Sequence, residues 1–276
     1  MKVAMNIDSA FECGQVYIML SRIQSIDQLY IVGNLSDSKI MTSMQALNES
    51  KRLEDISFNK NPPPWHLKDK NAVRIATVNC AGLIPHLRDI RKDEKLLEAN
   101  VIHILETSLP SQSDTSNITI EGYIGNYINI ANGKGIASFC REDTQIVKLK
   151  EIREHTLQIV KYDIHGIESI AIYRSSNHSL IEVTREIEKI VNVAKPTIVT
   201  GDFNECNIKN GNNSIVLRLT KLGFKQLVKD ATHIEGGHID HMYWLDETGE
   251  WEEPTVERYS PYWSDHDMIG ATIQRR

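Results

Sequence analysis

Residues 197–204 read Thr-Ile-Val-Thr-Gly-Asp-Phe-Asn, and this stretch decides the fold class. Its first four residues are β-branched and predict a short strand, and the residues from Gly201 to Asn204 follow where that strand ends. Upstream, residues 179–194 place apolar side chains at steps of three and four, which predicts an amphipathic helix. A helix that leads into a short apolar strand is typical of an α/β protein.

Short apolar runs rich in Val and Ile continue this pattern on both sides of that stretch. Four of them follow one another closely between residues 135 and 173, which suggests an antiparallel run. We expect strands at 73–78, 101–105, 135–140, 145–149, 157–162, 169–173, 197–200, 239–244 and 268–273, and helices at 88–99, 179–194 and 213–222. Strand runs that carry helices on the outside imply two sheets packed face to face between helical layers.

Polar residues stand where these expected strands end. They are Asn79, Glu106, Tyr173 with Arg174, Asp202 with Asn204, Asp240 with His241, and Asp265 with His266. Carboxylates and amides are hard oxygen ligands, which suit Mg²⁺ or Mn²⁺ better than zinc. The pattern therefore predicts a magnesium or manganese site together with at least one histidine.

Six motifs in chain order resemble the endonuclease/exonuclease/phosphatase superfamily, which contains abasic-site endonucleases, deoxyribonuclease I and the endonucleases of non-LTR retrotransposons. The motifs are Val-Asn at 78–79, Leu-Glu-Thr at 105–107, Tyr-Arg at 173–174, Gly-Asp-Phe-Asn at 201–204, Ile-Asp at 239–240 and Ser-Asp-His at 264–266. The resemblance implies a four-layer αββα sandwich of the DNase I-like type. It also implies a hydrolase that cuts phosphodiester bonds with a divalent metal.

The resemblance assigns the metal-binding residues of this chain. Glu106 would be the main ligand of Mg²⁺ or Mn²⁺, helped by Asn79 and Asp265. A metal held there polarises the phosphodiester and stabilises the departing 3′ oxygen.

The resemblance also assigns catalytic roles. His266 would contact the scissile phosphate, and Asp240 would hold its imidazole. Asp202 would align and deprotonate the attacking water. Asn204 and Tyr173 would donate hydrogen bonds where negative charge grows.

Three points around the assigned residues stay open. Either Ser176 or Asn177 could take a phosphate-contacting position, and Arg174 has no firm role. His241 could reach the site because it follows Asp240, whereas we interpret His103, His165, His178, His233 and His238 as structural or surface residues. Abasic-site enzymes tend to carry an acid two residues after the first-strand asparagine, but this chain has Ala81, so we expect a weaker metal affinity or abasic preference.

The N-terminal part differs in composition. Three prolines at 62–64 favour a stiff, extended connector, so we divide the chain into residues 1–58, a proline-rich linker at 59–70 and the nuclease-like domain at 71–276. Residues 11–22, with 29–31, resemble the last conserved motif of Pif-family helicases, where Gln15 and Arg22 would contact nucleotide phosphates. No Gly-Lys-Ser/Thr phosphate loop is present, so we expect a helicase remnant without ATPase activity. A helicase segment followed by such a nuclease resembles the C-terminal part of a Helitron-type transposase.

Composition limits the possible environments and partners. The 31 Lys and Arg against 37 Asp and Glu give a net charge of −6, which is not typical of a protein that coats DNA. No apolar run is long enough for a membrane span, and the four cysteines are spaced for neither zinc nor disulfides. We expect an intracellular, nuclear protein that binds DNA, has no membrane contact and uses no organic cofactor. Nothing in the sequence specifies an oligomeric state.

These observations favour a metal-dependent DNA endonuclease of transposable-element origin that leaves 3′-hydroxyl ends. One alternative is a phosphatase or phosphodiesterase of the same superfamily, because the site chemistry is shared. Another is a decayed, non-catalytic transposon fragment, because the helicase segment is truncated.

Overall fold

A computed structural model describes residues 3–6, 29–33, 72–130, 134–206 and 214–276 of the chain. The chain divides into two compact units, residues 1–62 and 63–276. In the first unit, β1 (Val3–Asn6) pairs in parallel with β2 (Leu29–Val32). The segment 11–22, which carries most of the resemblance to helicases, and the proline-rich segment 59–70 lie outside the described residues, so both expectations stay predictions.

The second unit contains two six-stranded sheets, and the first has the strand order β13-β14-β3-β4-β6-β5. Its strands are β3 (Val73–Asn79), β4 (Val101–Leu105), β5 (Tyr123–Ile128), β6 (Ile136–Arg141), β13 (Thr255–Tyr259) and β14 (Met268–Ile273). β3 and β4 are parallel, and every other neighbouring pair in this sheet is antiparallel. The carboxyl ends of β3 and β4 therefore meet at one edge, which is where Asn79 and Glu106 stand.

The second sheet has the order β11-β12-β10-β9-β8-β7. Its strands are β7 (Ile146–Arg153), β8 (Leu157–Ile164), β9 (Ile167–Arg174), β10 (Thr197–Asp202), β11 (Lys225–Gln226) and β12 (Asp240–Leu245). β9 and β10 are parallel, and the remaining pairs are antiparallel. The expected antiparallel run is present for β7, β8 and β9, whereas β6 belongs to the other sheet.

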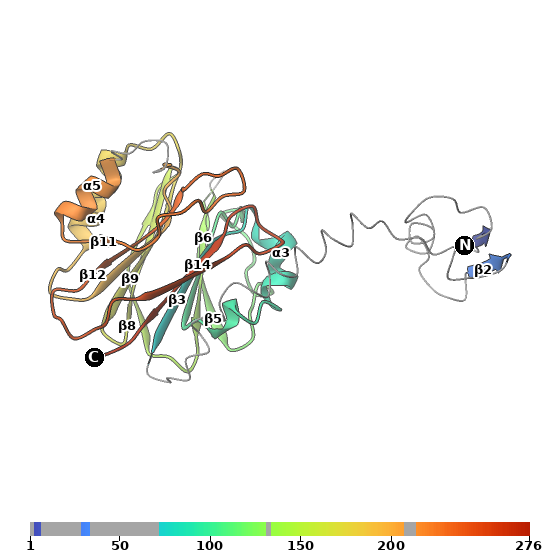
Figure 1. The fold of residues 1–276 in the computed structure, drawn as a ribbon, viewed down its shortest axis with the longest axis horizontal. Coiled ribbons are helices and arrows are strands. Elements are labelled where there is room, and N and C mark those ends of the chain that lie inside the picture. The colour runs from blue at the N-terminus through green and yellow to red at the C-terminus, as the bar shows by residue number, and fades with distance from the viewer. Residues whose placement is uncertain (1–2, 7–28, 34–71, 131–133, 207–213) are drawn as a thin grey trace. The chain divides into compact units, whose positions relative to one another are not determined.

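Helices cover the outer faces of the two sheets (Figure 1). α3 (Leu83–Ile90) buries Leu83 and Leu87 against the first sheet. α4 (Leu180–Ile190) and α5 (Ser214–Lys221) lie on the second sheet, where Val183 and Ile215 are buried. α3 and α4 each connect two parallel strands, a connection that cannot be made by a tight turn.

The helix that we predicted at 88–99 begins and ends earlier than expected. α3 covers Leu83–Ile90 and includes Pro85, which is tolerated in a first turn because its N–H is not needed there. A separate 3₁₀ turn follows at Leu96–Glu98, and its Leu96 N–H donates to the Asp93 carboxylate at 3.1 Å. The aspartate thus starts a new turn where we expected one continuous helix.

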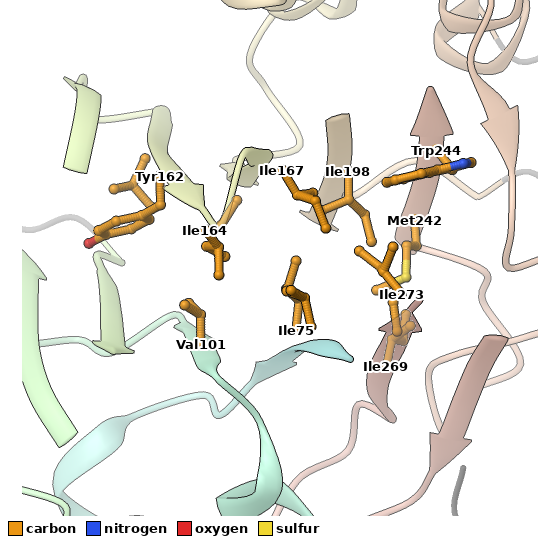
Figure 2. Packing of buried hydrophobic residues seen from close by; sticks show 14 of the residues in the cluster. Ile75, Val101, Tyr162, Ile164, Ile167, Ile198, Met242, Trp244, Ile269 and Ile273 are labelled. Atoms are coloured by element: carbon orange, nitrogen blue, oxygen red, sulfur yellow. The ribbon is translucent and has the colours of Figure 1, made fainter. Parts of the chain in front are cut away.

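The core between the sheets consists of apolar side chains from both (Figure 2). Ile75 and Val101 of the first sheet face Ile164, Ile167 and Ile198 of the second. Burial of both faces explains why the strands read as nearly continuous apolar runs rather than as an alternation.

Among the described residues, no helix is both long and apolar enough to cross a lipid bilayer. Cys80, Cys140 and Cys206 are free thiols.

Candidate active site

The candidate site lies where the two sheets face each other at the carboxyl ends of β3, β4, β9 and β10. Asp202 ends β10 and is paired in register with Tyr173 on β9 and with Asp240 on β12. Residues directly opposite one another share a face of the sheet, so the three side chains project together. Asn79 ends β3 in the other sheet, beside Leu105 of β4.

Two polar contacts join the sheets at this edge. The Thr200 hydroxyl donates to the Thr77 hydroxyl at 3.0 Å, and two residues further on the Asn79 amide donates to Asp202 Oδ2 at 2.8 Å. The strand period of two places both contacts on the facing surfaces of β3 and β10. The second contact brings together residues that are 123 positions apart in the chain.

Asp202 is almost completely buried, and each of its two carboxylate oxygens accepts one hydrogen bond. Besides the Asn79 amide, its carboxylate accepts the Asn204 N–H at 2.8 Å. Burial, and after it the charge of Asp240, raises the pKa of Asp202 to about 8, although His266, the Asn204 N–H and the Asn79 amide lower it. Such a carboxyl exchanges its proton near neutral pH, as a general base must.

His266 is held by an aspartate and a threonine. Its Nδ1 lies 2.9 Å from Asp240 Oδ2, and the same oxygen accepts the Thr232 hydroxyl at 2.8 Å. Burial lowers the pKa of His266, but the Asp240 hydrogen bond and the charges of Asp240, Asp202 and Asp265 outweigh it and raise that pKa to about 9. The imidazole is therefore a cation at neutral pH, and its Nε2 is not used by Asp240.

Glu106 follows β4 in a left-handed backbone conformation with φ of 53°. Its Oε2 accepts the Lys134 ammonium at 2.8 Å. Burial, followed by the charges of Glu106 and Asp202, raises the pKa of Tyr173 far above its ordinary value, so the phenol stays protonated. The charges of both carboxylates thus act on the Tyr173 hydroxyl.

Asn204 and Arg174 shape the loops beside Asp202. The Asn204 amide donates to the Arg174 carbonyl at 2.8 Å, and Asn204 has a φ of 48°. The Arg174 guanidinium donates to the carbonyls of Phe203, His178, Ser176 and Asn204. Since its donors are directed at the backbone, Arg174 acts as a loop-organising residue. Ser176 and Asn177 are both exposed next to it.

Asp265 stands apart from the other expected metal ligands. Its side chain is 50% exposed and lies 3.5 Å from His233 Nε2. Among the described residues, the acid and histidine clusters that could hold a cation are Asp202 with Asp240 and His266, and His233 with Asp265 and His266. Glu106 belongs to neither, so the structure does not bring Glu106 and Asp265 together as one ligand set.

His241 is a structural residue rather than part of the site. It is completely buried, its Nδ1 lies 2.8 Å from the Tyr243 hydroxyl, and its ring stacks on Phe203 at 5.0 Å between centroids. Burial lowers the pKa of His241 to about 3.

Sequence reasoning missed three residues of this region, Lys134, Thr232 and His233. Lys134 lies 28 positions from Glu106, and Thr232 is eight positions before Asp240, so neither spacing marks a pair. We interpreted His233 as structural or surface, yet its ring lies 4.7 Å from that of His266. The one available signal was a lysine directly before the strand predicted at 135–140.

No family model and no curated protein matches the sequence. Solved structures do match the fold. The AP endonuclease LMAP from Leishmania major has a TM-score of 0.58 at 11% identity, over 86% of this chain and 100% of that one. The endonuclease domain of TRAS1, a telomere-specific non-LTR retrotransposon, has a TM-score of 0.55 at 13% identity, over 74% and 98%. The 3′ phosphatase NExo from Neisseria, bound to a product DNA hairpin, has a TM-score of 0.53 at 14% identity, over 72% and 98%.

These similarities show that the chain has the DNase I-like α/β sandwich fold, which confirms the predicted fold class.

Proposed function

We propose that this chain is a divalent-metal-dependent endonuclease that hydrolyses phosphodiester bonds of DNA and leaves 3′-hydroxyl ends. The observation that carries the proposal is the buried cluster of Asp202, Asp240 and His266 at the strand ends, whose ligand atoms lie within 4.8 Å of one another. The cationic His266 can receive a phosphate, and Asp202, whose pKa is raised, can take a proton from a water.

In this proposal Asp202 is the general base. Its two oxygens are aimed by the Asn79 amide and the Asn204 N–H, so the carboxylate has little freedom to rotate. A water placed against Asp202 would lose its proton to this carboxylate as it attacks phosphorus. The pKa of about 8 makes Asp202 a stronger base than an exposed aspartate.

His266 is the proposed phosphate contact. Asp240 holds Nδ1, which leaves Nε2–H as the donor toward a non-bridging phosphate oxygen. The positive charge on the ring is stabilised by Asp240 and opposes the charge that develops in the transition state. Asn204 has a second amide hydrogen for the same purpose, and the protonated Tyr173 hydroxyl is the other proposed donor.

The residues present fit a hard divalent cation at Glu106. This carboxylate is only 13% exposed and already holds a cation, the Lys134 ammonium. Asn79 Oδ1 stands nearby and accepts the Ala81 N–H at 3.0 Å. We assign Mg²⁺, with Mn²⁺ as its substitute, to Glu106 and Asn79. Asp265 is the third proposed ligand, although its carboxylate groups with His233 and His266 rather than with Glu106. Such an ion, when bound, stabilises the leaving 3′ oxygen.

DNA is the proposed substrate, and transposable-element origin is the proposed history. The proteins that share the fold include AP endonucleases, a retrotransposon endonuclease domain and a phosphatase bound to a DNA hairpin. The resemblance of the N-terminal segment to a helicase points toward a Helitron-type element with the nuclease in its C-terminal part. A nuclear location would follow from that origin.

The test is nicking of supercoiled plasmid by the full chain with Mg²⁺, with Mn²⁺ and with EDTA. We expect nicking that stops in EDTA, and nicks that a DNA polymerase extends because they end in 3′-hydroxyl groups. Asp202→Asn and Glu106→Ala should abolish nicking. Asp163→Asn is the matched control, because Asp163 pairs with Lys195 at the opposite end of the second sheet.

Two results would contradict the proposal. Undiminished nicking by Glu106→Ala would remove the metal assignment. Release of terminal phosphate without any nicking would favour the phosphatase alternative.

A further inference from the structure

Lys134 stands beside the proposed metal ligand on a firmly held piece of backbone. Its carbonyl accepts the Ser108 N–H at 2.7 Å and the Thr107 hydroxyl at 3.2 Å. The next residue, Gly135, donates its N–H to Gln158 Oε1 at 3.1 Å and has a φ of 76°.

The close packing around Gly135 leaves no room for a side chain at this position. A Cβ at this position would lie 2.6 Å from Thr107 Oγ1 and 2.7 Å from the Ile128 carbonyl oxygen, closer than real Cβ atoms approach. The loop residue before β6 is thus tied to the residues that follow Glu106. The root of the Lys134 side chain is therefore fixed relative to the Glu106 carboxylate.

The Lys134 side chain ends on Glu106. Its ammonium lies 2.8 Å from Glu106 Oε2, and its side chain is 50% exposed while that of Glu106 is 13% exposed. The charge of the same carboxylate also acts on Tyr173 and helps to raise the pKa of its hydroxyl. In the metal-free protein, a monovalent cation of the chain itself thus occupies an oxygen that a divalent ion needs.

Two cations cannot share this carboxylate without cost. A divalent ion at Glu106 competes with the ammonium for Oε2, and the two positive charges repel each other at short range. The long, half-exposed lysine stem allows the ammonium to leave Glu106, whereas the anchored backbone keeps it near the site. The nearest new anion, when DNA is bound, is a phosphate of the substrate.

We propose that Lys134 couples metal binding to DNA binding: its ammonium competes with the divalent ion for Glu106 in the free protein and moves to a DNA phosphate in the complex. This inference rests on the proposed function, because it needs a metal at Glu106 and DNA as the substrate. It makes Lys134 a positioning residue whose effect on metal affinity depends on the substrate. A purely structural ion pair would not have that dependence.

The test measures Mn²⁺ affinity by calorimetry on the full chain, with the metal as the only ligand. Lys134→Met removes the competing charge, so Mn²⁺ should bind about tenfold more tightly, the change that about 1.4 kcal/mol produces. Lys134→Arg keeps the charge and should stay near the wild-type affinity. Lys225→Met is the control. Lys225 lies in β11 of the second sheet, is comparably exposed, and forms an ion pair with Glu253.

The second arm repeats the titration with a phosphorothioate duplex that resists cleavage. With DNA bound, the wild type and Lys134→Met should bind Mn²⁺ with affinities within about twofold of each other, because the ammonium has left Glu106. Lys134→Met should also bind the duplex more weakly, with a salt dependence reduced by about one phosphate contact.

The outcomes separate this inference from the proposed function. An Mn²⁺ affinity of Lys134→Met within about twofold of the wild type in the free protein overturns the inference, as does an advantage that persists unchanged with DNA. Neither result needs cleavage. Failure to nick plasmid while the Mn²⁺ difference is present would refute the endonuclease activity alone.

Discussion

Thr232→Val tests whether the support behind His266 matters for catalysis. The Thr232 hydroxyl donates to Asp240 Oδ2 at 2.8 Å, and it accepts the N–H groups of Asp240 at 3.0 Å and of Ile239 at 3.3 Å. Valine has nearly the same shape but no hydroxyl. The substitution leaves a buried carboxylate oxygen with one partner fewer and two N–H groups without this acceptor.

The magnitude follows from these lost contacts. A hydrogen bond to a charged group contributes about 1.5–3 kcal/mol, and a buried donor without an acceptor costs about 1–3 kcal/mol. Counting the charged hydrogen bond and one unsatisfied donor, we expect a loss of about 2.5–6 kcal/mol in the free energy of unfolding. Because Asp240 then holds the imidazole less rigidly, we expect kcat for plasmid nicking to fall by about 10- to 100-fold.

The assay compares kcat and urea unfolding for five proteins: wild type, Thr232→Val, Thr232→Ser, His266→Gln and the double variant Thr232→Val/His266→Gln. Serine keeps the hydroxyl, so its kcat should stay within about threefold of the wild type. His266→Gln alone should slow nicking by about 10²- to 10⁴-fold, the range for a positioned acid, base or phosphate contact. Adding Thr232→Val to it should cost less than about twofold more, because both act through the same ring.

A Thr232→Val protein that is folded and nicks within about threefold of the wild type would refute this reasoning. So would full additivity of the two substitutions. Either result would mean that Asp240 orients His266 without help from the threonine.

Three further predictions follow from other parts of the molecule. His103 is buried between the Ser138 and Ser169 hydroxyls, and burial lowers its pKa to about 3. Between about pH 6.5 and that value only the unfolded chain takes up a proton at this histidine, so the free energy of unfolding should fall as the pH drops from 8 to 5. In urea unfolding, His103→Gln should show about 2 kcal/mol less of this pH dependence than the wild type. The backbone N–H of Ala81 donates to Asn79 Oδ1, and Ala81 stands where an acid is absent, so we expect only a modest rate preference for a tetrahydrofuran lesion over intact duplex. A preference of several thousandfold would identify a repair enzyme. A chain that begins at Lys68 retains both six-stranded sheets and all the proposed site residues, so it should nick plasmid and melt within a few degrees of the full chain. The full chain should show no ATPase activity. A truncated chain that fails to fold would refute the domain boundary.

The sequence predicted the buried strands better than the edge strands. Each of the nine expected strands is present. Most of them are buried on both faces and therefore form continuous apolar runs, whereas β7 is a largely exposed edge strand that the sequence also indicated. In the second unit β5, β11 and β13 were missed, and in the first unit β1 and β2. β13 is an edge strand with partly exposed side chains, β5 has an exposed Ile124, and β11 has two residues, so their patterns give little signal.

The candidate site was predictable only as a list of residues. Polar side chains at strand ends indicated Asn79, Glu106 and Asp202, but nothing in the sequence specifies which strands of one sheet face which strands of the other. The Asn79 to Asp202 hydrogen bond depends on β3 crossing β10 at one particular register, which the Thr77 to Thr200 contact also requires. A shift of either strand by one residue would turn that strand's own member of each pair to the opposite face.

The sequence also does not show which groups a charged side chain will contact, as Arg174 and Lys134 illustrate. Both are cationic, but the fold directs the first at backbone carbonyls and the second at a carboxylate. Arg174 ends a strand beside the site, yet its guanidinium is directed at four backbone carbonyls, so little of it is left for a substrate. Lys134 stands outside the motifs, yet its ammonium reaches the Glu106 carboxylate. Orphan carbonyls of loops 174–178 and 203–204 need a planar cation with several donors, which only arginine supplies, whereas a single carboxylate oxygen is satisfied by one ammonium. The position of an unpaired acceptor, rather than the spacing of charges along the chain, therefore decides which cation remains available to the substrate.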